Sequence, residues 1–339
     1  MQDNLVDNIL NIYRIRPVKI GPKNIGYRNE SYPIYLKNQT ILNLIIYKKE
    51  PDILNRIKAA DKVSNYLNNL DFPTRINIYD KILAIKSPNF IKYAAIYNYL
   101  PGSTIPWEAY TMEHLKLLGQ MMSNIHYCLN KSNLNQNITF NTDVISGHIQ
   151  LLYSINTYLC DPGVKRALGH KLGLTYHQSI FDQFILFLNK LNLTDNFQIL
   201  HMDMVRGNIL YKKDNNHKLY ISGILDFEKT SLGPTMFDIA RTLAFLVIDC
   251  KYKSEEKIKK YFLTSGYNKR GNAKFNDIQI NLNGKYLSAL NLLINIFVLH
   301  DFYKFLLHNP YESLYLNEHY LRTKDFLIKN DILTSYQMF

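Results

Sequence analysis

The feature of this sequence that most constrains its fold is a short run of strand-forming residues inside a long region of helical pattern. Apolar residues recur at helical spacing through most of residues 111–191 and again from residue 237 onward. Between these regions, residues 197–228 alternate short apolar runs with a turn-forming cluster, a pattern typical of paired strands. We therefore expect a large helical body with a small β island inside it.

Chemically useful side chains gather at the strand ends of this island. One strand leads into a loop with His201 and Asp203, the next leaves the loop through Asn208, and a hairpin returns the chain to Asp226. This layout can bring two carboxylates and an amide oxygen to one point. Such hard oxygen ligands suit Mg²⁺, and a carboxylate offset from the metal can accept a proton from a hydroxyl nucleophile. Taken singly, Asp203 has the alternative of bonding its own backbone, and Asn208 that of a turn residue.

The first hundred residues are predicted to form a small unit of strands and turns. In chain order we expect a strand hairpin over 31–36 and 41–48, a helix over 53–67, and strands over 76–85 and 94–99. Further helices are expected after a Thr111 N-cap and over 144–159, 162–172 and 178–191. The breaker at residues 100–102 divides the chain into a sheet-rich lobe, 1–100, and a mainly helical lobe, 101–339, with the island at 197–228.

Composition places the chain among globular proteins of the cytoplasm. With 339 residues, 47% of them hydrophobic, it can bury a large core without crosslinks. Its three cysteines form neither a disulfide framework nor a CxxC pair, which fits a reducing compartment. The N-terminus carries acidic residues where a signal peptide needs positive charge, and polar residues interrupt the most apolar stretch, 289–307. We expect a cytoplasmic protein without a membrane segment.

The charge balance is basic, because 40 Lys and Arg against 28 Asp and Glu give a formal net charge of +12. A basic surface attracts the phosphates of nucleic acids. However, the chain is rich in Ile, Asn, Lys and Tyr throughout, and it has no recognition-helix pattern, zinc-finger spacing or long Lys/Arg run. Nucleic-acid binding is therefore disfavoured as the main function.

The motifs of the island resemble those of a known enzyme family. The segments HMDMVRGNIL and ILDFEKTSLGPTMFDIARTLAF look like the catalytic and metal-binding segments of the aminoglycoside phosphotransferase family, which includes choline and other small-molecule kinases. Upstream, GYRNESYPIYL, AAIYNYLPG and LLGQMMSNIH extend the resemblance over most of residues 20–250. The resemblance implies an α+β, bilobal, protein-kinase-like fold.

It also implies roles for the residues that match the family motifs. Asp203 corresponds to the catalytic Asp that accepts the proton of the acceptor hydroxyl or orients that hydroxyl. Asn208 and Asp226 correspond to the Mg²⁺ ligands that bridge the nucleotide phosphates. His201 and Asp238 correspond to residues that organise the catalytic loop.

The nucleotide-binding residues in the first lobe are less well defined. The strand LNLIIYKKE is expected to supply the Lys that binds the α- and β-phosphates, with Lys48 and Lys49 as its two candidates and Asp61 as their helix partner. Strand parity sends these two lysines to opposite faces, and surface lysines are the alternative interpretation. The strand that leads to the hinge adds Tyr97 and Tyr99 as candidate nucleotide contacts.

A glycine-rich phosphate loop is missing from this lobe. Gly21 and Gly26 do not form GxGxxG, so we expect backbone and side-chain amides around residues 27–31 to cover the phosphates. This departure motivates a second hypothesis, in which the chain is a nucleotide-binding module without turnover.

Two further residues are candidates for contact with phosphate or substrate. Arg206, three residues after Asp203, has a guanidinium able to neutralise the transferring phosphoryl group or the substrate; a solvated loop Arg is its alternative. Glu228 follows the metal-binding Asp and either approaches the metal or pairs with Lys229 or Arg241.

The leading hypothesis is an ATP- or GTP-dependent, Mg²⁺-requiring transfer of phosphoryl to a hydroxyl of a small molecule, a metabolite or an antibiotic. A polycationic acceptor is disfavoured because the chain from Lys251 onward has more Lys and Arg than Asp and Glu. The candidate pocket residues are His300, Asp301, Tyr303 and Tyr320 on the late helices and Trp107 just after the hinge, with core packing as the alternative role of the aromatic residues. The oligomeric state stays open.

Overall fold

The computed structural model describes residues 2–25, 29–87, 90–136, 138–140, 143–192, 197–269 and 280–336. Their contacts divide the chain into two compact units. The first unit joins residues 1–104 with residues 207–230, and the second joins residues 105–206 with residues 231–339. The first unit therefore includes a β hairpin that the sequence-based division assigned to the second lobe.

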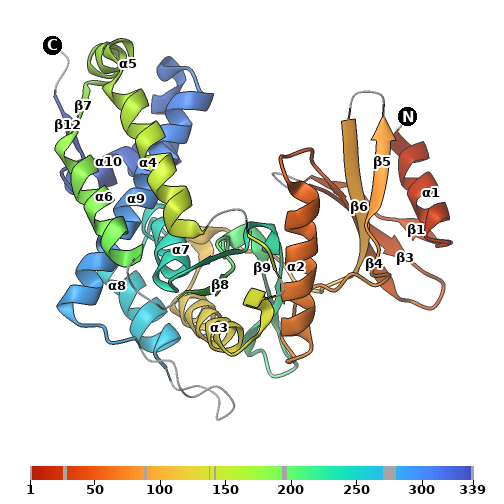
Figure 1. The fold of residues 1–339 in the computed structure, drawn as a ribbon. Coiled ribbons are helices and arrows are strands. Elements are labelled where there is room, and N and C mark those ends of the chain that lie inside the picture. The colour runs from red at the N-terminus through yellow and green to blue at the C-terminus, as the bar shows by residue number, and fades with distance from the viewer. Residues whose placement is uncertain are drawn as a thin grey trace. The chain divides into compact units, whose positions relative to one another are not determined.

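A six-stranded antiparallel sheet forms the centre of the first unit (Figure 1). Its strands are β1 (Lys19–Ile20), β2 (Asn24–Ile25), β3 (Glu30–Tyr35), β4 (Ile41–Tyr47), β5 (Leu83–Ser87) and β6 (Phe90–Asn98). Their order is β1-β3-β4-β6-β5, with β2 paired to β3. The predicted hairpin is confirmed, since β3 and β4 pair from Glu30 with Ile46 to Tyr35 with Ile41. The strand predicted over 76–85 is mostly wrong: β5 starts at Leu83, because the chain first turns through Asp80 at a positive φ of 48°.

Two helices cover opposite faces of this sheet (Figure 1). Helix α1 (Gln2–Ile12) packs Val6, Ile9 and Leu10 onto the face that carries Ile34 and Leu44. Helix α2 (Ile53–Asn68) was predicted correctly and packs its apolar side onto the other face. Side chains alternate across a strand, so β4 and β6 supply residues to both cores. The sheet is thus buried on both sides.

The hairpin of β9 (Ile209–Lys213) and β10 (Leu219–Ile224) belongs to the same unit. Its two strands are antiparallel, with an irregularity between Ile221 and Gly223. Two isolated bridges tie it to the N-terminal residues: Thr74 pairs with Ile224, and Ser103 pairs with Tyr211. The chain reaches the second bridge through Gly102, whose φ of 139° is a conformation that favours glycine.

The second unit is mainly helical. Its longer helices are α3 (Met112–Asn130), α4 (Val144–Cys160), α6 (Ser179–Asn192), α7 (Met236–Asp249), α9 (Gly284–His308) and α10 (Glu318–Lys329). The shorter ones are α5 (Pro162–Ala167), α8 (Glu255–Lys259) and the π-helical turns η3 (Leu168–Leu172) and η6 (Lys260–Tyr267). Short strand pairs join β8 (Gln198–Leu200) to β11 (Ser231–Gly233), and β7 (Leu174–Tyr176) to β12 (Leu333–Ser335). The predicted helices over 144–159, 162–172 and 178–191 are confirmed, and Thr111 caps α3 within a capping box.

Helix α9 runs through the core of this unit. By length and hydropathy it meets the criterion for a membrane-spanning helix, with half of its most apolar window buried inside the protein. Core helices of soluble proteins meet the same criterion, so this is weak support for a span. Helices α4, α7 and α10 all contact α9, which makes it the element on which the unit packs.

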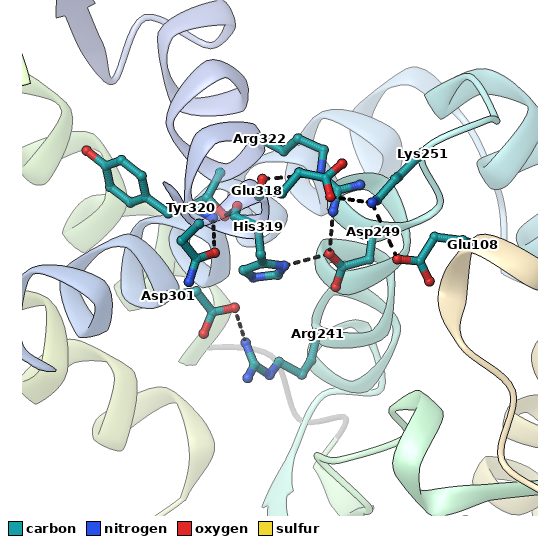
Figure 2. Close-up of polar contacts among 11 residues, drawn as sticks. Glu108, Arg241, Asp249, Lys251, Asp301, Glu318, His319, Tyr320 and Arg322 are labelled. Atoms are coloured by element: carbon teal, nitrogen blue, oxygen red, sulfur yellow. Dashed lines mark hydrogen bonds and ion pairs between the residues drawn. The ribbon is translucent and has the colours of Figure 1, made fainter. Parts of the chain in front are cut away.

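Ion pairs join α7 to its neighbours (Figure 2). Arg241 donates to Asp301 of α9 at 3.1 Å. At the C-terminal end of α7, Asp249 contacts His319 at 2.5 Å and accepts from Arg322 at 3.3 Å, both on α10. These pairs fix the positions of three helices relative to one another within the unit.

Close packing of α3 against η6 predicts that a substitution of Gly119 on α3 destabilises the fold. A Cβ on Gly119 would lie 2.1 Å from the carbonyl oxygen of Phe262, so Gly119→Ala is expected to lower the free energy of unfolding by about 1–3 kcal/mol, although Ala is the better helix former. Urea unfolding measures this loss. Gly284→Ala is the control, because a Cβ there meets no atom within 4 Å, and equal losses in both variants would contradict the packing argument.

Candidate active site

The catalytic loop predicted from the sequence lies in the second unit, directly after β8. All three β8 residues are buried, and the strand pairs with β11. His201 is fully buried and Asp203 is 6% exposed. The backbone N–H of Asp203 donates to Nδ1 of His201 at 3.2 Å, so the imidazole supports the loop from within. A buried carboxylate on a short, supported loop has few conformations available, which is what proton transfer requires.

Asp238, in the first turn of α7, holds the backbone of this loop. Its carboxylate accepts from the N–H of His201 at 2.8 Å and from the N–H of Met202 at 2.5 Å. Met202 has a positive φ of 60°, which is uncommon for a residue with a side chain. The two hydrogen bonds stabilise this strained residue, and the shape of the loop therefore depends on Asp238.

A histidine on α3 completes this support. Nε2 of His126 lies 3.0 Å from Oδ2 of Asp238, and its Nδ1 lies 2.7 Å from the hydroxyl of Tyr267. Burial works to raise the pKa of Asp238, but hydrogen bonds and the charges of His126 and His201 outweigh it and lower that pKa below its usual value. Our sequence reasoning assigned no role to His126, although it ends the quoted segment LLGQMMSNIH.

The two predicted metal ligands lie at the open end of the β9–β10 hairpin, in the first unit. The N–H of Leu225 donates to the carbonyl oxygen of Asn208 at 2.8 Å, one residue before Asp226. Asp226 has a left-handed backbone (φ 62°, ψ 63°) and begins the short helix η5 (Phe227–Lys229). The hairpin register therefore brings Asn208 and Asp226 to the same end.

The chemistry of these residues fits Mg²⁺. Carboxylate and amide oxygens are its preferred protein ligands, and Mg²⁺ in phosphotransferases is usually held by one or two such groups together with substrate phosphates. Nearby, Oε2 of the buried Glu228 has no hydrogen-bond partner. Within the described ranges, no group of three or more His, Cys, Asp or Glu is placed to hold a metal ion. The assignment of Asn208 and Asp226 as ligands stays a prediction.

The predicted nucleotide-binding side chains have different environments. Lys48 and Lys49 follow the last residue of β4 and are exposed. Tyr97 is fully buried between the sheet and α2, whereas Tyr99, beyond the end of β6, is 40% exposed. Their roles as nucleotide contacts stay predictions. Of residues 27–31, which were predicted to cover the phosphates, 27 and 28 lie outside the described part of the chain.

The predicted pairing of Asp61 with a lysine was wrong. Asp61 accepts instead from the hydroxyl of Tyr97 at 2.9 Å and from the side-chain amide of Asn77 at 3.0 Å. Burial raises the pKa of Asp61, and these two hydrogen bonds partly oppose the rise. The reason is geometric: β4 presents Tyr47 to α2, and both lysines come after it.

Glu228 and Arg206 also differ in their surroundings. Arg206 is exposed. Glu228 is buried and pairs with Arg75, not with Lys229 or Arg241 as the sequence suggested. The sequence reasoning missed Arg75 altogether, because no local motif marks it.

The candidate pocket residues of the second unit make mostly packing contacts. Trp107 is buried with its ring 4.6 Å from that of Tyr110, and Tyr320 stacks on Phe302. Tyr303 packs edge-on against Tyr158. Asp301 is paired with Arg241, as described above. A role in acceptor binding stays a prediction for these residues.

Comparison with known proteins supports both the motifs and the fold. Residues 156–251 match the profile of the phosphotransferase enzyme family. No curated protein sequence matches the chain.

Many solved structures are similar to it, and three of them are described here. Amicoumacin kinase hAmiN in complex with AMP-PNP, Ca²⁺ and Ami is 13% identical, with 94% of this chain and 93% of that chain covered and a TM-score of 0.66. The GDP complex of wild-type aminoglycoside 2'-phosphotransferase-IIIa is 11% identical, with 95% and 98% covered and a TM-score of 0.61. Plasmodium vivax ethanolamine kinase is 16% identical, with 90% and 80% covered and a TM-score of 0.55. At these identities the similarity shows the fold alone.

The family match includes β8, the loop with Asp203, the hairpin with Asn208 and Asp226, and α7 with Asp238. The structural matches extend over nearly the whole chain and give it an α+β, protein-kinase-like fold. Motifs and fold agree with the resemblance seen in the sequence: residues 156–251 match the phosphotransferase enzyme family, and the chain as a whole has the protein-kinase-like fold.

Proposed function

We propose that this protein transfers the γ-phosphoryl group of ATP or GTP to a hydroxyl group of a small molecule. The observation that carries the proposal is the buried carboxylate of Asp203 on a loop whose backbone is fixed by Asp238. Complexes of similar structures with AMP-PNP and with GDP support the nucleotide, and the AMP-PNP complex also contains Ca²⁺.

In the proposed mechanism, the carboxylate of Asp203 accepts a hydrogen bond from the acceptor hydroxyl and orients its oxygen toward the γ-phosphorus. As the new O–P bond forms and the bond to the leaving nucleoside diphosphate breaks, Asp203 takes the hydroxyl proton. Asn208 and Asp226 would hold Mg²⁺, which when bound neutralises charge on the nucleotide phosphates. Positioning and charge neutralisation supply most of the rate, since the protein forms no covalent bond.

The acceptor is proposed to be a metabolite or an antibiotic that is not a polycation. The net charge of +12 favours neutral or anionic molecules over polycations at the protein surface. The cytoplasm is the proposed location, where both nucleotides and Mg²⁺ are available; none of the three cysteines, all in the described part of the chain, is in a disulfide.

A nucleotide-binding module without turnover is the second candidate. It is favoured by the exposure of Lys48 and Lys49 and by the tyrosine partner of Asp61, which leave the usual phosphate-binding lysine unassigned.

Two measurements distinguish the candidates. Thermal shift with ATP or GTP, with and without Mg²⁺, is expected to show Mg²⁺-dependent stabilisation. Release of nucleoside diphosphate is then measured across a panel of hydroxylated metabolites and antibiotics. Acceptor-dependent release supports phosphoryl transfer, and stabilisation without release on any acceptor supports the binding module. If neither stabilisation nor release is observed, both candidate functions are rejected.

A further inference from the structure

The first unit contains a network of buried, hydrogen-bonded polar side chains that the mechanism above does not use. Its centre is Arg75, which follows α2 and is 9% exposed. The guanidinium donates to the carboxylate of Glu228, lies 4.6 Å from the ring centre of Tyr97, and approaches the hydroxyl of Tyr47 at 3.5 Å. Burial alone would lower the pKa of Arg75, but Glu228 beside it raises that pKa above its usual value. Arg75 is therefore a buried, charged group.

In this network, each hydrogen bond between Arg75 and Asp61 is donated in the direction of Asp61. Tyr97 donates its single hydroxyl hydrogen to Asp61 at 2.9 Å. In the 2.7 Å contact between the two tyrosine hydroxyls, Tyr47 must therefore be the donor. Tyr47 in turn accepts from Arg75. The guanidinium of Arg75 is therefore hydrogen-bonded to the carboxylate of Glu228 directly and linked to that of Asp61 on α2 through two tyrosine hydroxyls.

The backbone around Arg75 is also fixed to both neighbours. The N–H of Ile224 donates to the carbonyl oxygen of Pro73 at 2.8 Å, and Thr74 bridges to Ile224. The hydroxyl of Ser64 on α2 donates to the carbonyl oxygen of Arg75. These contacts fix the backbone of Arg75 between α2 and β10, and β10 is the strand that leads to Asp226.

Glu228 connects this network to the candidate metal ligand. One of its carboxylate oxygens takes the hydrogen bond from Arg75, and its backbone carbonyl accepts from Nε of Arg56 on α2 at 2.9 Å. Asp226, two residues earlier, has a left-handed backbone, which a non-glycine residue keeps only when its surroundings impose it. The anchored side chain and backbone of Glu228 supply such a constraint.

We propose that Arg75 is a positioning residue for the nucleotide–metal site: through Glu228 it sets the conformation of residues 226–229, and through Tyr47 and Tyr97 it couples that conformation to α2. The inference rests on the proposed function. The connection of α2 to the site then depends on an arginine outside the sheet, and not on the exposed lysines that follow β4.

The test compares Arg75→Gln with Arg75→Lys. Groups that orient metal ligands typically change metal affinity or activity by about 10- to 100-fold when replaced. We expect Arg75→Gln to weaken Mg²⁺-dependent nucleotide binding, measured by calorimetry, by about tenfold or more, and to raise the KM for the Mg²⁺–nucleotide more than it lowers kcat. In the nucleotide-free protein, the amides of residues 226–229 should exchange hydrogen faster. Arg75→Lys keeps a buried cation beside Glu228 and is expected to restore most of both properties.

Arg322→Gln is the matched control, since it removes an ion pair with Asp249 in the second unit. It is expected to lower the melting temperature and to leave the Mg²⁺ requirement unchanged. If Arg75→Gln behaves in the same way, with normal exchange at 226–229, Arg75 is a structural residue only and the proposal is wrong.

Two further comparisons test the inference even if Arg75→Gln does not fold or the proposed function is wrong. If Arg75→Gln does not fold, Tyr97→Phe removes the hydroxyl between Tyr47 and Asp61 but keeps the ring beside the guanidinium; exchange at 226–229 should still rise, and unchanged exchange overturns the proposal. If the unmodified protein binds no Mg²⁺–nucleotide, the proposed function fails, and the exchange comparison still decides the role of Arg75.

Discussion

Replacing Asp203 with asparagine is expected to lower turnover by about a hundred- to ten-thousandfold. Asparagine has nearly the same shape, and its backbone N–H can still donate to His201, so the loop should keep its conformation. What is lost is the carboxylate that takes the hydroxyl proton. The variant is therefore expected to fold and to bind Mg²⁺–nucleotide with an affinity close to that of the unmodified protein.

The measurement is release of nucleoside diphosphate with the acceptor found in the panel, together with thermal shift on Mg²⁺–nucleotide. Asp182→Asn is the control, because Asp182 is an exposed carboxylate of α6 in the same unit and should keep full activity. Turnover of Asp203→Asn within threefold of the unmodified protein would refute Asp203 as the base.

Replacing Asp238 with alanine is expected to reduce stability and turnover together. The substitution leaves the N–H groups of His201 and Met202 without their buried acceptor, and it removes the partner of His126. Losing one partner of a buried, charged network typically costs about 3–5 kcal/mol. The free energy of unfolding in urea at neutral pH measures this cost, and a loss below about 1 kcal/mol would contradict the proposed dependence of the loop on Asp238.

The pH dependence of Asp238→Asn gives a second, more specific result. Because the pKa of Asp238 is lower in the folded protein than its ordinary value of 3.8, its ionisation stabilises the fold above that value. That stabilisation is lost as the pH falls through the lower, folded pKa. The difference in unfolding free energy between the unmodified protein and Asp238→Asn is therefore expected to be constant from pH 7 to about pH 5 and to shrink below pH 4. A difference that grows on acidification would show that the carboxylate is not favoured in the ionised form.

Local patterns predicted most of the second unit, the island and part of the first unit. The helices at 144–159 and 178–191, the cap at Thr111 and the hairpin of β3 and β4 all depend on residues close in sequence. Helix α1 was missed although Val6, Ile9 and Leu10 have helical spacing, because Asp7 and Asn8 between them resemble a polar terminus. Its apolar side is recognisable only once the sheet that covers it is known.

In the candidate site too, residues within a local motif were predicted, whereas contacts between residues distant in sequence were not. Asp203, Asn208 and Asp226 were singled out because their spacing within one short segment follows a recognisable motif. The pairing of Arg75 with Glu228 joins residues 153 positions apart, and no local pattern relates them. The partner of Asp61 was predicted wrongly for a related reason: whether a helix carboxylate meets a lysine or a tyrosine depends on where the neighbouring strand ends, here at Tyr47.

The contacts that hold the catalytic loop are made to its backbone. Asp238 accepts from the N–H groups of residues 201 and 202, and the hydroxyl of Thr242 donates to the carbonyl oxygen of Met204 at 3.2 Å. Because every residue except proline has the same main-chain donor and acceptor, we expect these contacts to be kept when the exposed side chain at position 206 is exchanged for any other except proline. Arg206 is predicted from the sequence to contact phosphate or substrate, so we propose a library of variants at that position as a test of whether it affects acceptor choice.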